Sequence, residues 1–404
     1  MKNLYCDVVI AGCGVAGLFT ALHLSKEKKI LMLAKEDLES CDSMLAQGGI
    51  CVLRDEEDYD SYFEDTMRAG HYENRRESVD IMIRASRGVI DQLVTYGVRF
   101  ERKPDGSLHY TGEGAHQRPR ICYHKDITGK EITTSLLNQV KKLQNVTMLQ
   151  YTAMTDLITA NGVCTGIVAR TGEGEILHIY ADDTVMATGG IGGLYKHSTN
   201  FPLLTGDACK IAEKHGIALE HMDYVQIHPT SLYSQRPGRS FLISESARGE
   251  GAILLNHKGE RFVDELLPRD VVTKAIQDEM KKEQVEHEWL SFENVPAEII
   301  ENHFPHIYER CLEEGFDLKK EPIPIVPAQH YFMGGVHVDC DSRTTMPHLY
   351  AVGETSCNGV HGKNRLASNS LLESLVFAER AAAKIQQTQK GKKHYESNYH
   401  AACC

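Results

Sequence analysis

Apolar positions in the first 35 residues predict a strand, a helix and a second strand. An apolar run at 4–10 is followed by the glycines of "AGCGVAG", a helical pattern to about Glu27, and the run "ILMLA" at 30–34. This order opens a dinucleotide-binding unit, because the glycines permit a tight turn, a close backbone approach to a pyrophosphate and close helix–strand packing. The helix N-terminus adds partial positive charge for phosphate. The acidic residue that would grip a ribose hydroxyl is replaced by Lys35, which weakens a simple NAD interpretation.

Two later apolar runs predict strands that return to the same sheet. They are "DDTVMATGGIGG" at 182–193 and "HLYAVGETS" at 348–356, and more than 150 residues separate them. The segment between them must therefore include an inserted domain, which we place at 222–332 with a helix near 271–285. The nucleotide-binding domain then comprises 1–221 and 333–390, with a final helix from about Ser368, and 391–404 form a polar tail.

Composition and charge limit the classes of function. At roughly 100 to 200 residues per domain, 404 residues predict two or three domains. The formal net charge of -12 argues against general binding of nucleic acid or anionic membranes, because both need basic surfaces. The sequence has neither a signal-peptide pattern nor a run near the ~18 apolar residues of a membrane span, so we expect a cytoplasmic protein. Its 12 cysteines include no CxxC pair, which predicts reduced thiols and no metal site.

Charged residues within glycine-rich or polar segments are candidate ligand contacts. Taken singly, each has an ordinary explanation: a buried histidine is more often structural than catalytic, and Arg269 beside Asp270 could form a helix-start ion pair worth ~0 to 1 kcal/mol. Together, two histidines and one or two arginines predict a local cationic pocket suited to carboxylates, which arginine binds bidentately. The candidates are His228 in "VQIHPTSL", Ser244, Glu245 and Arg248 in "ISESARGEGA", Arg269 in "LLPRDVVTKAI", His330 in "PAQHYFMGG", and His361 and Arg365 in "HGKNRLASNSLLE".

These segments occur in one order from residue 4 to about 385. They include "AGCGVAGL", "SMLAQGGI", "MATGGIGGLY", "QIHPT", "ESARGEGA", "PRDVVTKAI", "PAQHYFMGGV", "YAVGETS" and "GKNRLASNSLLESLVF". The set resembles the flavoprotein family of succinate dehydrogenase, fumarate reductase and L-aspartate oxidase, and resembles the aspartate-oxidising members most. The resemblance implies an α/β fold, with a Rossmann-like FAD-binding domain and an inserted α+β capping domain. We expect the family's usual C-terminal helical domain to be absent, because the sequence stops at Cys404.

The resemblance also implies roles for individual residues. His228, Ser244, His330 and Arg365 match dicarboxylate-binding positions, Glu245 lies in the same motif, and Arg269 matches the acid/base arginine. Because the pKa of arginine exceeds ~12, we expect Arg269 mainly to orient the substrate and stabilise charge. Asp42 stands where membrane-bound succinate dehydrogenases carry the histidine that bonds to FAD, so non-covalent FAD is expected. The positions that match FAD contacts are Gly12, Cys13, Gly14, Val15, Ala16, Gly17, Lys35, Asp42, Ser43, Met44, Leu45, Ala46, Gln47, Gly48, Gly49, Asp207, Glu354, Ser370 and Leu371.

Glu113 decides between two substrates. It lies in "TGEGAHQRPR" at 111–120, where it could be an ordinary solvated acid. L-Aspartate differs from succinate by an amino group that is cationic at neutral pH, which a pocket of arginines and histidines would repel. In the resembled oxidases the glutamate of this motif meets that group.

We therefore predict FAD-dependent oxidation of L-aspartate to iminoaspartate, the first step of NAD biosynthesis. Electrons would pass to O2 or fumarate, and quinolinate synthase is the candidate functional partner. The alternatives are soluble fumarate reduction or succinate oxidation, a flavoprotein subunit of a membrane complex, and an inactive flavin-binding module.

Overall fold

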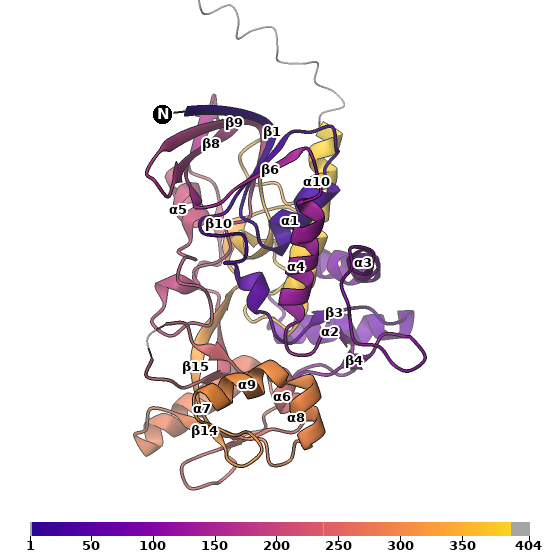
Figure 1. Cartoon of the computed structure of the whole chain (residues 1–404), viewed down its shortest axis with the longest axis vertical. Coiled ribbons are helices and arrows are strands. Elements are labelled where there is room, and N and C mark those ends of the chain that lie inside the picture. The colour runs from indigo at the N-terminus through magenta and orange to yellow at the C-terminus, as the bar shows by residue number, and fades with distance from the viewer. Residues whose placement is uncertain (1, 237, 389–404) are drawn as a thin grey trace, which may run out of the picture.

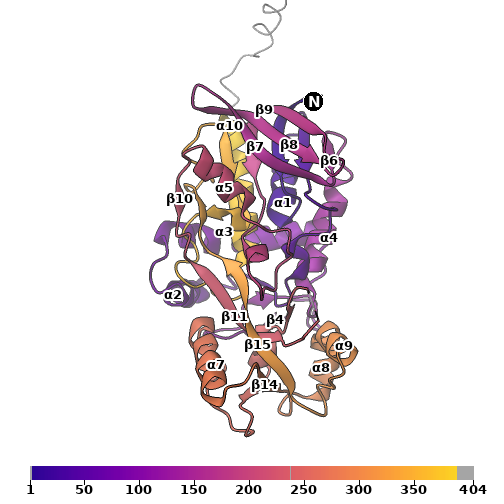
Figure 2. The same cartoon turned by 90° about the vertical axis from the view of Figure 1, so that its left-hand side faces the viewer.

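The computed structural model describes residues 2–236 and 238–388, which form two lobes (Figure 1). The larger lobe contains the N-terminal strand and α10 (Asn369–Thr388). The smaller lobe, orange in Figure 1, contains α7 (Arg269–Glu283), α8 (Ala297–His303) and α9 (Pro305–Glu313). Figure 2 shows β11 (Val225–Leu232) and β15 (Ile323–Phe332), which pair antiparallel, running from one lobe into the other. The predicted tail at 391–404 lies outside the described residues.

A seven-stranded sheet forms the centre of the larger lobe. Its order is β6-β2-β1-β9-β8-β7, and β17 also pairs with β9. The strands are β1 (Lys2–Ala11), β2 (Ile30–Leu33), β6 (Val146–Leu149), β7 (Thr152–Ala160), β8 (Val163–Thr171), β9 (Ile176–Met186) and β17 (Leu349–Ala351). The predicted strand–helix–strand unit and both returning strands are confirmed, because β9 and β17 pair in parallel within this sheet.

Both faces of this sheet are buried, which explains why β1 is apolar at consecutive positions. Val8 and Ile10 belong to the core that includes α1 (Val15–His23), α4 (Thr128–Val140) and α10. Val9 and Ala11 belong to a second core on the opposite face, together with α5 (Asp207–Lys214). α2 (Tyr59–Ala69) and α3 (Arg76–Thr95) extend the first layer of helices.

The smaller lobe combines a five-stranded sheet with helices, so the predicted α+β inserted unit is confirmed. The sheet order is β12-β11-β15-β14-β13, with β12 (Phe241–Leu242), β13 (Ile253–Leu255) and β14 (Glu288–Ser291). Its own core includes Leu254, Ile276 and Phe304. The helix expected near 271–285 forms as α7 and begins at Arg269. The domain limits at 222 and 332 stay a prediction.

Short elements connect the two lobes. β3 (Ile50–Cys51), β5 (Ile121–Cys122) and β4 (Tyr110–Thr111) form a three-stranded sheet, and the loop between β4 and β5 carries Glu113. The remaining elements are β10 (Leu219–Glu220), β16 (Gly335–His337), β18 (Ser356–Cys357), α6 (Glu245–Gly249), η1 (Asp42–Leu45), η2 (Glu56–Asp58), η3 (Gly192–Leu194) and η4 (Gly353–Thr355).

The described residues also bear on the expectations for membranes, metals and thiols. None of their helices is long and apolar enough to cross a membrane. Within the same residues, no group of three or more histidine, cysteine, aspartate or glutamate side chains is arranged to hold a metal ion. The ten cysteines in this part of the chain are free, in agreement with the predicted reduced thiols, and seven of them are buried.

Candidate active site

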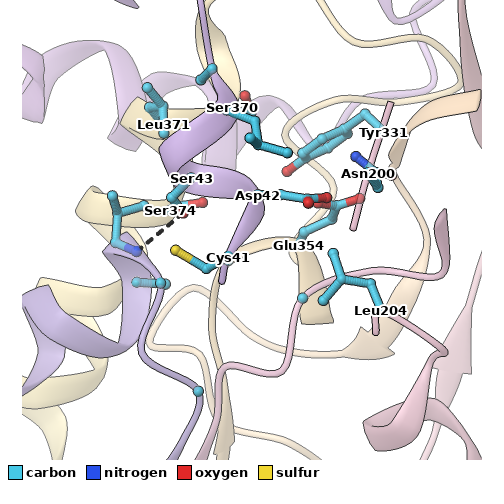
Figure 3. Close-up of a pocket in the computed structure, with 18 of the residues that line it drawn as sticks. Cys41, Asp42, Ser43, Asn200, Leu204, Tyr331, Glu354, Ser370, Leu371 and Ser374 are labelled. Atoms are coloured by element: carbon cyan, nitrogen blue, oxygen red, sulfur yellow. Dashed lines mark hydrogen bonds between the residues drawn. The ribbon is translucent and has the colours of Figure 1, made fainter. Parts of the chain in front are cut away.

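One cavity extends from the glycine turn after β1 to polar residues of the smaller lobe. Figure 3 shows part of its lining, around Asp42 and Glu354. Most of the predicted cofactor positions line the cavity, and Gly17 and Met44 do not. All of the predicted substrate positions line it as well: Glu113, His228, Ser244, Glu245, Arg269, His330 and Arg365. The fold therefore brings residues that are far apart in the sequence to a single site.

The glycine turn packs closely on its neighbours and lines the cavity at the start of α1. Gly12 has φ +124°, and a Cβ there would lie 1.9 Å from the carbonyl oxygen of Ala187, so no other residue fits without a shift of backbone. A Cβ at Gly17 would lie 2.1 Å from the carbonyl oxygen of Gly12, which explains why Gly17 packs helix on strand and does not line the cavity. The amide of Val15 donates to Ser43 Oγ at 3.2 Å. The N-terminus of α1 thus faces the cavity, where it favours phosphate.

Lys35 and Asp207, both predicted cofactor contacts, pair with each other. Lys35 Nζ lies 2.7 Å from Asp207 Oδ2 and also donates to the carbonyl oxygen of Leu203 at 2.8 Å and to Thr205 Oγ1 at 3.1 Å. The lysine therefore ties β2 to the start of α5. Met44 points elsewhere, since its sulfur accepts a hydrogen bond from Thr134 Oγ1 at 3.8 Å.

Two half-buried residues, Asp42 and Glu354, project their carboxyl groups into the cavity near Tyr331 (Figure 3). Asp42 Oδ1 accepts from the amide of Phe201 at 2.8 Å, whereas Oδ2 is buried without a partner. Glu354 Oε1 accepts from the amide of Phe332 at 2.9 Å. Burial raises the pKa of Asp42 to about 7; burial and then the charge of Asp42 raise the pKa of Glu354 to about 8. At neutral pH this pair can donate as well as accept hydrogen bonds.

His228 and His330 meet at the other end of the cavity because they lie on the paired strands β11 and β15. Their rings are 5.0 Å apart in an edge-to-face arrangement. His330 Nδ1 is 2.8 Å from Thr199 Oγ1, whereas His228 Nε2 is buried without a partner. Burial and then the charge of Arg269 hold the pKa of both histidines well below 6.5. The predicted contribution of the histidines to a cationic pocket is therefore wrong: at neutral pH they are uncharged, and the arginines supply the positive charge.

Arg269 and Arg365 are both buried and held by neighbouring side chains. Arg269 donates through Nε to Glu245 and through Nη1 to Gln226 Oε1 at 2.9 Å. Arg365 donates through Nη1 to Ser370 Oγ at 3.2 Å and lies over the ring of Tyr331, 4.7 Å from its centroid. Burial lowers the pKa of Arg365 to about 10, so it stays a cation at neutral pH. Its Nε has no partner and remains available to a ligand.

Glu245 joins Arg269 to a third arginine, so three charges form a buried chain. Arg248 Nη2 lies 3.6 Å from Glu245 Oε2, and the arginine side chain is fully buried. Burial is the largest influence on Glu245 and opposes its ionisation, but the charges of Arg269 and Arg248 outweigh it and lower its pKa. Glu245 is therefore ionised and holds Arg269 at the cavity wall. Ser244, which caps α6 by accepting from the amide of Ser246 at 3.2 Å, fixes the start of this helix.

The interpretation of Glu113 as a solvated loop acid is wrong, because it is only 6% exposed. Its Oε1 accepts from Ser246 Oγ at 3.0 Å and its Oε2 from Ser368 Oγ at 2.6 Å. A Cβ at Gly48 would lie 2.2 Å from Glu113 Oε1, so a glycine is needed for this approach. Burial and then the charge of Glu245 raise the pKa of Glu113. A buried carboxylate lined up with the cavity is the natural complement of an ammonium group.

Comparison with known proteins gives the same family. The family described as FAD binding domain matches residues 7–371. The L-aspartate oxidase of Clostridium perfringens is 50% identical over 386 residues, which cover 95% of this chain and 87% of that protein. The chain belongs to the L-aspartate oxidase family. The family member from Clostridium acetobutylicum is 46% identical, with 96% and 89% of the two chains covered.

The fold of this L-aspartate oxidase family member also resembles solved fumarate reductases. A mutated E. coli quinol fumarate reductase chain superimposes with a TM-score of 0.90 at 30% identity, with 98% of this chain and 72% of that chain covered. The predicted fold class, with an FAD-binding domain, is therefore confirmed.

The cradle fits FAD, the cofactor of the L-aspartate oxidase family. Gly12, Gly14 and Val15 line the cavity where α1 begins, and the N-terminus of this helix favours a pyrophosphate. Asp42 Oδ2 and Gln47 Oε1 are buried polar atoms without a partner in the protein, and buried polar groups normally have one. A ligand with hydroxyl, phosphate and ring hydrogen-bonding groups would satisfy both. The predicted FAD positions that line the cavity are the residues that would hold it.

We expect FAD to be bound without a covalent bond. A carboxylate at Asp42 lacks the imidazole nitrogen through which succinate dehydrogenases attach their flavin. The purified protein should therefore be yellow, and acid precipitation should release all of the colour into the supernatant. Colour that stays with the washed protein pellet would contradict this prediction. A denaturing gel of the same sample, viewed for flavin fluorescence, provides an independent control.

Three contacts of the site were missed by sequence reasoning. Gln226 lies two residues before His228 in the same strand, and the two-residue period of a strand could have placed it on the same face. Tyr331 follows His330 directly and carries the Arg365 guanidinium on its ring. Thr199, which orients His330, lies outside the helices and strands and gives no periodic signal.

Proposed function

We propose that the protein oxidises L-aspartate to iminoaspartate with FAD as its cofactor. The observation that carries this proposal is the buried carboxylate of Glu113 in a cavity that also holds Arg269 and Arg365. Two cations suit the two carboxylates of the substrate, and the anion suits its ammonium group. The names of relatives at 46% and 50% identity support the same reaction.

The side chains divide the work of binding. Arg365 pairs with one substrate carboxylate, since its Nε is buried and unpartnered. Neutral His228 and His330 donate hydrogen bonds without adding charge, and the unpartnered Nε2 of His228 is free to do so. Glu113 accepts from the ammonium group and so helps to turn the single hydrogen of C2 towards the cofactor. Holding the reacting carbon in one orientation contributes to the rate by proximity.

FAD, when bound, accepts the electron pair released as the C2–H bond of the substrate breaks. Arg269 stabilises negative charge at the reacting centre, and its own position is set by Glu245 and Gln226. The buried ion pairs of Glu245 with Arg269 and Arg248 hold Arg269 in place. Because the two arginines keep Glu245 ionised, it serves as their counter-ion.

Fumarate or O2 takes the electrons in the second half of the cycle. Fumarate is a dicarboxylate, so the arginines that hold aspartate also suit it. We also propose that iminoaspartate, which water hydrolyses, is consumed by quinolinate synthase in the cytoplasm. Fumarate reduction or succinate oxidation alone is the second candidate, supported by 30% identity to a quinol fumarate reductase. Neither fumarate nor succinate has an ammonium group that Glu113 could bind.

Anaerobic bleaching of the flavin tests the proposal. L-Aspartate should bleach the yellow colour rapidly, whereas succinate at the same concentration should do so at least tenfold more slowly, because it has no ammonium group for Glu113. The bleached protein is then mixed with O2 or with fumarate to identify the acceptor by the return of colour. Rapid bleaching by succinate and none by aspartate would favour the second candidate.

A further inference from the structure

The first turn of α7 is fastened to the larger lobe by the residue that follows Arg269. Asp270 Oδ2 lies 3.0 Å from His71 Nε2, and Asp270 Oδ1 accepts from Asn364 Nδ2 at 3.3 Å. His71 and Asn364 both belong to the larger lobe, whereas Asp270 belongs to the smaller one. One carboxylate therefore spans the boundary between the lobes next to the active-site arginine.

The same contact is part of a closed circuit of hydrogen bonds. Asn364 Oδ1 accepts from Gln226 Nε2 at 2.7 Å, and Gln226 Oε1 accepts from Arg269 Nη1 at 2.9 Å. Arg269 and Asp270 are consecutive in the chain, so the path Asp270–Asn364–Gln226–Arg269 returns to its start. Gln226 Nε2 also donates to the carbonyl oxygen of Arg365 at 2.7 Å. The circuit thus links the positions of both active-site arginines.

The loop that presents His71 adopts an unusual backbone conformation. His71 has φ 58° and Tyr72 has φ 60°, and consecutive left-handed residues other than glycine are costly. Hydrogen bonds hold the loop in this shape, since the amide of Tyr72 donates to the carbonyl oxygen of Met67 at 2.8 Å. Asn364 is anchored to the same loop, because its Nδ2 donates to the carbonyl oxygen of Ala69 at 3.1 Å. The positions of His71 and Asn364 are therefore set by contacts within the larger lobe that do not involve α7.

We propose that Asp270 is a positioning residue for Arg269. Its carboxylate docks the start of α7 on the larger lobe and so places the guanidinium against Gln226 and the substrate. This proposal rests on the proposed function, because it assigns Asp270 to the reaction in which Arg269 takes part. The simpler alternative is that Asp270 only stabilises the N-terminus of a helix, as acidic residues in a first turn do. That role affects stability but leaves the placement of Arg269 unchanged.

The experiment uses the FAD-loaded protein and the variant Asp270→Ala. We expect the rate constant for anaerobic flavin reduction by L-aspartate to fall at least about tenfold, because small misplacements of an active-site group are costly. The Kd for succinate, read from the flavin spectrum, should rise by a smaller factor than the rate constant falls, because Arg365 and the histidines keep their contacts with the dicarboxylate when Arg269 is misplaced. Asp270→Asn keeps an acceptor for Asn364 and should restore the rate to within about threefold of the unaltered protein. Asn364→Ala removes the hydrogen bonds of the same circuit on the side of the larger lobe. If Asp270→Ala does not retain FAD, the rate of flavin reduction is measured in Asn364→Ala instead.

Two matched aspartates provide the controls. Asp278 lies on the exposed side of the same helix, 2.9 Å from Lys274, and Asp278→Ala should leave the rate unchanged. Asp126 also links the lobes, by accepting from the amide of Ile307 at 2.6 Å at the start of α9, but it is outside the circuit. Asp126→Ala should therefore slow flavin reduction less than Asp270→Ala does.

The outcomes separate this inference from the proposed function. Equal losses in Asp126→Ala and Asp270→Ala would overturn it, since they would indicate general loosening of the lobes. An unchanged rate in Asp270→Ala with a lower melting temperature would overturn it in favour of the helix-end role. If the unaltered protein is not bleached by L-aspartate at all, the proposed function fails. The comparison of variants is then made with fumarate as oxidant of the chemically reduced flavin, a reaction that uses the same arginine.

Discussion

Replacing Arg269 by leucine is expected to slow flavin reduction by L-aspartate by about a thousandfold or more, with the fold retained. Arg269 is the cavity cation held by Glu245 and Gln226, and removal of one preorganised group that stabilises developing charge typically costs a hundred- to a thousandfold in rate. Leucine cannot replace the charge or the hydrogen bonds. Glu245 keeps Arg248 as a partner, so the loss of Arg269 does not leave its carboxylate without a cation. Anaerobic stopped-flow absorbance at the flavin band measures the effect.

Arg261→Leu is the matched control for this variant. Arg261 lies in the same lobe and pairs with Glu265, but its side chain is 56% exposed and does not line the cavity. Its replacement should leave the rate within about twofold, because Arg261 has no contact with the site. Both variants should bind FAD and show similar melting temperatures. If Arg269→Leu is reduced within tenfold of the unaltered rate, Arg269 has no part in the chemistry.

The nucleotide-binding half of the fold was predictable because local and global signals agree there. β1 is buried on both faces and is therefore apolar at successive positions, and the turn after it can be made only by glycine at Gly12. Signals of this kind need no knowledge of distant residues. The separation of 182–193 from 348–356 was enough to predict an insertion, and the pairing of β9 with β17 confirms it.

The charge state of the site was not predictable from residue types. His228 and His330 were counted as cations, but burial and the nearby Arg269 keep both neutral. Lys35 looked like a missing ribose acid, yet it forms an ion pair with Asp207, 172 residues away in the chain. Such effects depend on which groups the fold brings together and on how much water remains around them. A list of residue types contains neither quantity.

The circuit around Gln226 shows the same limit for hydrogen bonds. Gln226 and Asn364 are separated by 138 residues and have no periodic or compositional signal that relates them. Both side chains can donate and accept hydrogen bonds, so they can connect Asp270 to Arg269 and restrict the position of the Arg269 guanidinium. Only the approach of β11 to the segment before α10 places them within reach. Sequence motifs therefore identified the charged groups of the site and missed the uncharged groups that orient them.

Replacing Glu113 by glutamine is expected to weaken L-aspartate binding roughly 30-fold or more, which corresponds to about 2 kcal/mol or more, because it removes the charge that faces the ammonium group from a buried site. Succinate has no ammonium group, so its Kd should stay the same or decrease. Glutamine keeps an acceptor for one of the two serines, Ser246 or Ser368, and its NH2 can donate to the hydroxyl of the other, so the size and shape of the side chain are preserved. The Kd for succinate is read from changes in the flavin spectrum. The affinity for L-aspartate is measured as the KM of anaerobic flavin reduction. Equal changes for both ligands would refute the assignment.

The pH dependence of binding provides a second measurement on the same variant. Burial and then the charge of Glu245 raise the pKa of Glu113, so its carboxylate becomes protonated at a higher pH than an exposed glutamate, whose pKa is about 4.3. Below that raised pKa the group is neutral and no longer attracts the ammonium group. Affinity for L-aspartate should therefore fall as the pH is lowered through this range, and affinity for succinate should not fall with it. In Glu113→Gln the difference between the two ligands should disappear, and a pH profile for L-aspartate unchanged by the substitution would show that another group causes it.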